Sequence, residues 1–188
     1  MRFTCYCSSS STVDEHFREA ARRLGGAIAA RGDELVYGGT SVGLMGVLAE
    51  AVRAGGGRVS GVVPELMEAR GLADHAADEL VVTEGMSGRK QEMITRADAF
   101  VALPGGFGTL EELFEVLTLK QLGYHRKPIV LLDVQRFWTP LLELFETLYA
   151  TGFARPEYAA LYHVAADVED LLAYVDAYDP EDLPTKWW

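Results

Sequence analysis

Short apolar runs alternate along the chain with longer amphipathic stretches. The short runs predict strands, and the longer stretches, in which apolar residues recur every three or four positions, predict helices. Strands are predicted at residues 3–6, 34–37, 58–63, 79–83, 99–103, 128–132 and 161–164, and helices at residues 13–31, 42–54, 88–97, 109–122, 140–151 and 168–178. Such alternation is typical of an α/β protein with three layers, in which helices flank a mainly parallel sheet.

The 188 residues are predicted to form a single domain, residues 1–188, with an irregular acidic tail at residues 179–188. In a parallel α/β sheet, ligands bind beyond the carboxyl ends of the strands. The turns that follow Tyr37, Thr83 and Leu103 open on this edge, and they contain the most unusual residues of the sequence. We therefore expect the functional site there.

The composition limits the possible partners. Hydrophobic residues make up 49% of the chain and charged residues 24%, as in ordinary globular proteins, and no apolar stretch approaches the length of a membrane span. No signal peptide is recognisable, so we expect a cytoplasmic protein without a membrane partner. The net charge of −11 repels phosphate backbones, which argues against a nucleic-acid partner. A small phosphorylated ligand remains possible, because a few local cations and helix dipoles suffice to bind it.

Neither the cysteines nor the histidines form a metal-binding pattern. Cys5 and Cys7 alternate on a predicted strand and share one of its faces, which suits neither an intrachain disulfide nor a four-ligand zinc site. We interpret them as small buried apolar groups. The four histidines are scattered and lack metal-ligand spacing. We predict no metal site and no other cofactor.

The strongest candidate site is the sequence PGGFGTLEE at residues 104–112, which joins a predicted strand to a predicted helix. Glycines allow a phosphate to approach the backbone, and free N–H groups at a helix start favour an anion. Glu112, one turn into the helix, adds a carboxylate to this cradle. A competing explanation is a capping box, in which Thr109 is the N-cap and Glu112 completes the helix start without any chemistry.

A second glycine-rich turn, YGGTSVGLMG, spans residues 37–46. It is not a Walker A loop, because Leu44 stands where that motif needs a lysine, and it does not match the G-x-G-x-x-G dinucleotide pattern. Neither a P-loop NTPase nor a standard NAD enzyme is therefore supported. The turn either contributes to phosphate binding or simply packs a helix closely against a strand.

The third candidate segment is MSGRKQEM at residues 86–93. Two adjacent cations, Arg89 and Lys90, are predicted at a helix start, where they oppose the helix dipole and require a compensating anion or carboxylate. Glu92 and Arg96 follow at helical spacing, so the alternative is a solvated helix face with ordinary ion pairs.

Taken together and in this order, the three segments resemble the LOG ("lonely guy") family. PGGFGTLEE matches the family signature P-G-G-x-G-T-x-x-E, and the resemblance extends over nearly the whole chain through the cysteine-and-serine end of the first strand, YGGTSVGLMG, the M-x-x-R-K segment and DAFVALPGG. LOG proteins are cytokinin riboside 5′-monophosphate phosphoribohydrolases, often mislabelled lysine decarboxylases. The resemblance implies a Rossmann-like fold, a nucleoside 5′-monophosphate as small-molecule partner, and a homodimer or larger assembly with sites near the subunit interface.

The resemblance also assigns roles to residues. The catalytic pair would be Arg89 and Glu112. Substrate and phosphate binding would involve residues of all three segments, namely Gly38, Gly39, Thr40, Gly43, Met86, Lys90, Gly105, Gly106, Gly108 and Thr109. The implied reaction is hydrolysis of the N-glycosidic bond of an N6-modified adenosine 5′-monophosphate to the free base and ribose 5-phosphate.

Three positions depart from the family pattern. Thr40 and Ser8 stand where the family usually or often has glycine, and Gly88 stands where it commonly has a charged residue. Thr40 would either crowd a phosphate or add a hydroxyl donor, which leaves the reaction class intact but the exact substrate open. Two alternatives to the implied function are a broad nucleosidase acting on AMP and other nucleoside monophosphates, and a non-catalytic nucleotide-binding carrier or sensor. Lysine decarboxylation has little support, because no lysine lies in a recognisable pyridoxal phosphate motif.

Overall fold

The computed structural model describes residues 1–180, so residues 181–188, most of the predicted tail, lie outside the described part. Within the described residues, seven strands form one sheet in the order β4-β3-β2-β1-β5-β6-β7, and all neighbouring strands are parallel. The strands are β1 (Arg2–Tyr6), β2 (Glu34–Tyr37), β3 (Arg58–Pro64), β4 (Glu79–Thr83), β5 (Ala99–Ala102), β6 (Ile129–Leu132) and β7 (His163–Ala165).

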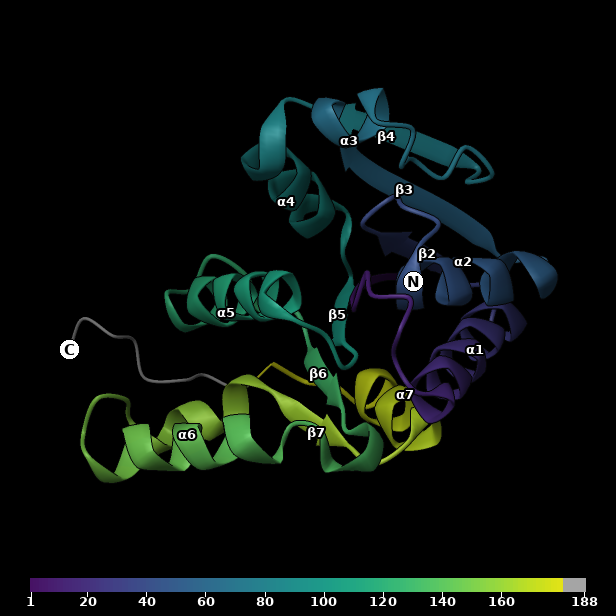
Figure 1. The fold of residues 1–188 in the computed structure, drawn as a ribbon. Coiled ribbons are helices and arrows are strands. Elements are labelled where there is room, and N and C mark those ends of the chain that lie inside the picture. The colour runs from purple at the N-terminus through teal and green to yellow at the C-terminus, as the bar shows by residue number, and fades with distance from the viewer. Residues whose placement is uncertain (181–188) are drawn as a thin grey trace.

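Helices cover both faces of the sheet, which gives the predicted three-layer α/β architecture (Figure 1). The helices of the described residues are α1 (Glu15–Ala30), α2 (Gly43–Ala54), α3 (Glu65–Ala69), α4 (Gly85–Arg96), α5 (Phe107–Gln121), α6 (Thr139–Ala150) and α7 (Val168–Asp176), with the 3-10 turns η1 (Val134–Arg136) and η2 (Pro156–Leu161). Helices α1, α2 and α7 pack on one face, and α4, α5 and α6 on the other.

The sheet is apolar on both faces, which explains why its strands read as continuous apolar runs rather than as alternating patterns. Leu35 and Tyr37 pack toward α1 and α2, whereas Val36 between them packs toward α4 and α5. Cys5 and Cys7 are free, buried thiols on the α1 and α2 side, so their interpretation as small apolar groups is confirmed. Burial raises the pKa of both thiols well above the usual range.

The connections place a crevice between β1 and β5. From β1 the chain runs outward through β2 and β3 to β4, then crosses back to β5 beside β1 and continues outward to β7. The connections that leave β1 and β5 therefore diverge in opposite directions. Ligands of doubly wound sheets bind at such a topological switch point, outside the carboxyl ends of the strands.

Several element boundaries differ from the prediction. Helix α4 begins at Gly85 rather than Gly88, and α5 begins at Phe107 rather than Thr109, so both helices start earlier than the sequence pattern indicated. Helix α3 was not predicted, because its five residues bury no side chain and leave no apolar periodicity. Strand β7 begins at His163 because the turn η2 occupies the residues before it.

Candidate active site

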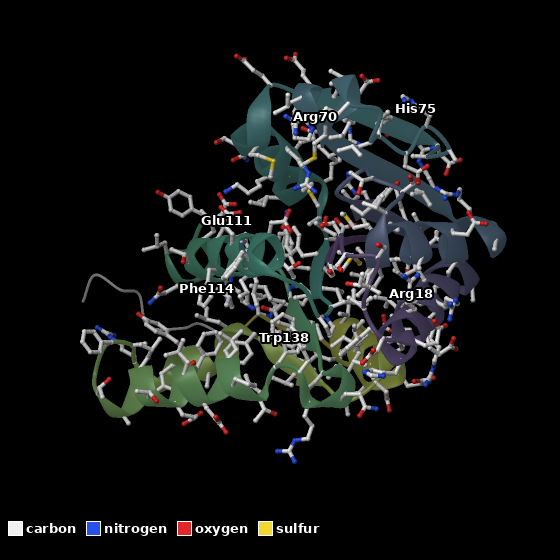
Figure 2. All side chains as sticks on the ribbon, viewed as in Figure 1. Arg18, Arg70, His75, Glu111, Phe114 and Trp138 are labelled. Atoms are coloured by element: carbon white, nitrogen blue, oxygen red, sulfur yellow. The ribbon has the colours of Figure 1, made fainter. Side chains whose placement is uncertain are left out.

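A cavity of about 520 Å³ opens at the carboxyl ends of β1, β2 and β5, at the switch point of the sheet. The turns after these three strands and residues of α2, α3, α4 and α5 form its wall. Side chains from α4 and α5 fill the space between the two helices, and sulfur atoms gather near α4 (Figure 2). The cavity lining thus combines charged and hydroxyl side chains with the apolar side chains of methionines.

Arg89 and Glu112 form a buried ion pair in the cavity wall. Arg89 on α4 donates from Nη1 to Oε1 of Glu112 on α5 over 2.8 Å, and both residues are only 7% exposed. The Nε group of Arg89 donates to the backbone oxygen of Val62 on β3 over 3.0 Å. Three elements that are distant in sequence therefore fix the guanidinium and the carboxylate.

The first glycine of the YGGT turn makes room for this ion pair. A Cβ atom at Gly38 would lie 1.9 Å from Nη2 of Arg89 and 2.8 Å from Sδ of Met45. Any side chain at position 38 would displace the guanidinium. Gly38 therefore determines where Arg89 can lie, and through it the position of Glu112.

The electrostatics of the pair follow from its burial. Burial raises the pKa of Glu112 above its usual value, while the charge and the hydrogen bond of Arg89 oppose this rise. Tyr6 at the end of β1 also lines the cavity, and burial raises its pKa, with a further rise from the Glu112 carboxylate, so it remains a neutral phenol. A carboxylate in such a poorly hydrated site can stabilise positive charge on a substrate more strongly than it could in water.

The second glycine cluster leaves backbone open to the cavity. A Cβ atom at Gly106 or Gly108 would meet no protein atom within 4 Å, and both residues line the cavity. These residues form the start of α5, whose first N–H groups have no partner within the helix. Gly105 lacks a side chain for a different reason, because a Cβ atom there would lie 2.1 Å from Oγ1 of the buried Thr109. This arrangement suits an anion such as phosphate.

The first glycine cluster mainly serves packing. Gly39 and Gly43 have positive φ angles of +70° and +61°, and a Cβ at Gly43 would lie 2.5 Å from the backbone of Ser9. Gly38 and Thr40 line the cavity, whereas Gly39 and Gly43 do not. Close packing of the helix against the strand thus accounts for Gly39 and Gly43, whereas Gly38 and Thr40 belong to the cavity wall.

The cations of α4 have separate roles. Arg89 and Lys90 lie in the second turn of α4 rather than at its start, because the helix begins at Gly85. Lys90 pairs with Glu111, labelled in Figure 2, and with Glu115 at 3.1 Å, both on α5, and does not line the cavity.

For Arg96, the alternative interpretation of this segment, a solvated helix face with ordinary ion pairs, is confirmed. Its guanidinium contacts Glu92 at 2.6 Å and Glu79 at 2.7 Å. Arg89 does not join this solvated network, because its side chain is buried against Glu112.

The capping-box interpretation of Glu112 is wrong. The N-cap of α5 is Gly106, no side chain caps the helix, and Thr109 is already its third residue. The Glu112 carboxylate bonds to Arg89 instead of reaching back to the helix start. The sequence contains the complete capping-box pattern, but Arg89 on α4 determines the conformation of the Glu112 side chain.

Some cavity residues were missed by sequence reasoning. Four of the five methionines line the cavity, and only Met86 had been proposed for the site. The other three, Met45, Met67 and Met93, lie on three different helices, so no local signal connects them. Leu72 and Val42 extend the same apolar wall.

Among the described residues, no group of three or more His, Cys, Asp and Glu side chains is placed to hold a metal ion. No helix in residues 1–180 is long and apolar enough to cross a membrane.

The fold and the cavity define a Rossmann-like α/β protein with a cavity at the topological switch point. The sequence model of a family described as "possible lysine decarboxylase" matches residues 45–175. A cytokinin riboside 5′-monophosphate phosphoribohydrolase of Arabidopsis thaliana is 42% identical over 96% of this chain and 83% of its own. A rice (Oryza sativa subsp. japonica) protein of the same name is 41% identical over 96% of this chain and 74% of its own. The chain belongs to this family, the LOG phosphoribohydrolases.

Solved structures show the same fold. The molybdenum cofactor carrier protein of Chlamydomonas reinhardtii is 30% identical and superimposes with a TM-score of 0.71 over 93% of this chain and 95% of its own. A structural genomics target, TM1055, reaches a TM-score of 0.73 at 20% identity over 94% of this chain and 99% of its own, which supports the fold alone.

The open backbone at Gly108 generates a first prediction. Gly108→Ala lies inside helix α5 and meets no protein atom, so the free energy of unfolding should stay unchanged or rise by up to about 1 kcal/mol. Inorganic phosphate should nevertheless bind at least about tenfold more weakly, because the new methyl group points into the anion site. Gly26→Ala in α1, which also meets no atom and lies outside the cavity, is the matched control. Calorimetric titration and thermal melts measure both effects, and unchanged phosphate affinity in Gly108→Ala would contradict the cradle.

Proposed function

We propose that the protein hydrolyses the N-glycosidic bond of N6-modified adenosine 5′-monophosphates and releases the free base and ribose 5-phosphate. The buried Arg89–Glu112 pair, in a cavity that also contains the open start of α5, is the observation that supports this most directly. The names of the Arabidopsis and rice relatives support the same reaction class.

The chemistry needs a group that stabilises positive charge on the sugar. Hydrolysis breaks the bond between C1′ and the base nitrogen, and the transition state resembles an oxocarbenium ion. Water then supplies the hydroxyl group on C1′ and the proton that the base takes up. In this proposal the Glu112 carboxylate lies beside the ribose, stabilises its charge and orients the water. Arg89 holds the carboxylate in its ionised form and in place.

The two ends of the cavity suit the two ends of such a substrate. The 5′-phosphate would lie against Gly106 and Gly108, where its binding energy positions the sugar beside Glu112. The methionine wall, formed by Met45, Met67, Met86 and Met93, would receive the base and an apolar N6 substituent, since methionine side chains adapt to irregular apolar groups.

Two other functions differ from this one in testable ways. A broad nucleoside-monophosphate nucleosidase would use the same residues but show no preference for an N6 substituent. A non-catalytic carrier receives support from the likeness to the Chlamydomonas molybdenum cofactor carrier protein. A carrier needs the phosphate cradle but has no evident use for a buried carboxylate–guanidinium pair, so we favour the enzyme.

The cellular setting follows from the same proposal. We place the enzyme in the cytoplasm, acting in the release of free cytokinin-type bases from their nucleotides. We also propose a homodimer, because apolar side chains on and near α5 and α6 face solvent in the single chain: Phe114, Leu144 and Phe153.

The phosphate requirement can be tested with matched substrates. AMP and N6-alkylated AMP should be cleaved with kcat/KM values at least about a hundredfold above those of the matching nucleosides, because the phosphate contributes binding energy that positions the sugar. The free base is followed by chromatography. Comparable values for adenosine and AMP would contradict the proposal, and equal values for AMP and N6-alkylated AMP would favour the broad nucleosidase.

Removing the charge of Glu112 tests its chemical role. Glu112→Gln can still accept the hydrogen bond from Arg89 but cannot stabilise the sugar cation, so kcat should fall by about 10²-fold or more. Arg89→Ala should lose a similar factor, and the double variant should lose less than the product, because both residues act on one transition state. Burial raises the pKa of Glu112, so the carboxylate should become protonated at a higher pH than an ordinary carboxyl group. Wild-type activity should therefore fall on acidification at a pH above the usual pKa of a glutamate side chain.

Glu111→Gln is the control for this series, because Glu111 is the neighbouring, exposed partner of Lys90. It should keep wild-type kcat. Thermal melts establish that each variant is folded, and Glu112→Gln should lose about 1–3 kcal/mol of stability, since the buried guanidinium loses its counter-charge. A folded Glu112→Gln protein with near-wild-type kcat would favour the carrier.

The homodimer can be tested in solution. Burial of the apolar side chains on α5 and α6 in an interface of standard size, roughly 1,200 Å² or more, should give a mass of about twice that of the chain in light scattering. Phe114→Glu together with Leu144→Glu should shift the protein toward the monomer. A wild-type mass of 20.6 kDa across micromolar concentrations would contradict the dimer.

A further inference from the structure

Thr40 places a hydroxyl group in the cavity wall beside the apolar side chain of Met45. Its side chain is 4% exposed and lines the cavity. Among the described residues, its hydroxyl contacts one partner, the sulfur of Met45, to which it donates over 3.7 Å. A thioether is a weak acceptor, and a hydroxyl can also accept hydrogen bonds through two lone pairs. A buried hydroxyl bonded in this way lacks a strong partner, and the cavity is where one can come from.

The backbone around Thr40 is held on several sides. Thr40 forms an isolated antiparallel bridge with Ala73, and the N–H of Asp74 donates to the oxygen of Gly39 over 2.8 Å. The buried Asp74 carboxylate in turn accepts hydrogen bonds from the Tyr37 hydroxyl at 2.7 Å and from Arg53 at 2.9 Å. This network fixes the backbone of the turn and thereby keeps Thr40 in the cavity wall.

The position of Thr40 in the cavity identifies the part of a ligand that it can reach. Met45 touches the Thr40 hydroxyl, and its sulfur and Nη2 of Arg89 both lie against Gly38. Thr40 follows β2, whereas the open glycines Gly106 and Gly108 follow β5, two strands away in the sheet. The hydroxyl therefore lies beside Met45 of the methionine wall, and its strand is two places away in the sheet from the strand that leads to the open glycines.

We propose that the Thr40 hydroxyl hydrogen-bonds to a polar atom of the nucleobase and thereby contributes to base selection. The identity of the ligand rests on the proposed function, in which the phosphate lies at α5 and the base lies against the methionine wall. The methyl group of Thr40 adds to that wall, while its hydroxyl gives a directional contact beside Met45. Apolar contacts discriminate poorly between bases of similar shape, and a hydrogen bond adds such discrimination.

Three substitutions separate the hydroxyl from the methyl group. Thr40→Val keeps the shape and removes the hydroxyl, Thr40→Ser keeps the hydroxyl and removes the methyl group, and Thr40→Gly removes both. The probes are AMP and ribose 5-phosphate, which share the phosphate and the sugar and differ by the base. Thr40→Val should raise the KM for AMP about tenfold, as expected for a lost buried hydrogen bond, with a much smaller change in kcat. Thr40→Ser should keep a KM within about threefold of wild type.

Ribose 5-phosphate provides the decisive control. Its Ki as a competitive inhibitor should be the same for wild type, Thr40→Val and Thr40→Ser, because it has no base to contact Thr40. Equal KM values for AMP in wild type and Thr40→Val would overturn the proposal, and so would a parallel rise in the Ki of ribose 5-phosphate, which would assign Thr40 to the sugar or the phosphate. Thermal melts confirm that each variant is folded.

Failure of the proposed function would be visible separately. If the wild-type protein releases no base from any monophosphate, the hydrolase assignment fails, and the Kd of AMP from calorimetric titration replaces KM in the same comparison. A tenfold weaker Kd in Thr40→Val with unchanged ribose 5-phosphate binding would still support the contact to the base. An unchanged Kd would overturn it.

Discussion

The site depends on one buried interaction, the ion pair between Arg89 and Glu112. Burying two opposite charges is costly unless the geometry is good and the remaining donors are satisfied. Here the Val62 oxygen accepts a hydrogen bond from Nε of Arg89, and Glu112 accepts one from Nη1. The absence of a side chain at Gly38 leaves the space that Nη2 needs. Helices α4 and α5 must both lie on the same face of the sheet for this to happen. The requirement links the fold directly to the chemistry, because a shift of either helix would leave a buried charge without its partner.

The two glycine clusters look alike in the sequence but differ in what surrounds them. Around Gly38 and Gly43, protein atoms from α4 and from the β1 turn occupy the space that a side chain would need. Around Gly106 and Gly108 that space is empty and faces the cavity. One cluster therefore makes room for other parts of the protein, and the other leaves open space in the cavity wall. The distinction depends on residues distant in sequence, so a motif comparison cannot make it.

Sequence reasoning was accurate where local pattern determines structure. Continuous apolar runs located all seven strands of the described residues, because a sheet covered on both faces requires them. It was less accurate at helix starts, where turn chemistry and tertiary contacts compete. Thr109 and Glu112 form a complete capping pattern, yet α5 begins two residues earlier and Glu112 bonds to Arg89. The pairing of Arg89 with Glu112 came from the family resemblance, and the methionine wall was beyond local pattern because its members come from separate helices.

The distribution of charge explains how a strongly acidic protein can accept an anion. Lys90 and Arg96 are each paired with carboxylates outside the cavity, and of the described residues that line the cavity Arg89 alone is cationic. Glu112 already compensates most of that charge. In the proposed function, phosphate binding then rests on the N–H groups at the start of α5 rather than on a cluster of basic side chains. A site of that kind would rely on fixed dipoles at short range, so it would select a small anion that fits against the glycines and not an extended polyanion.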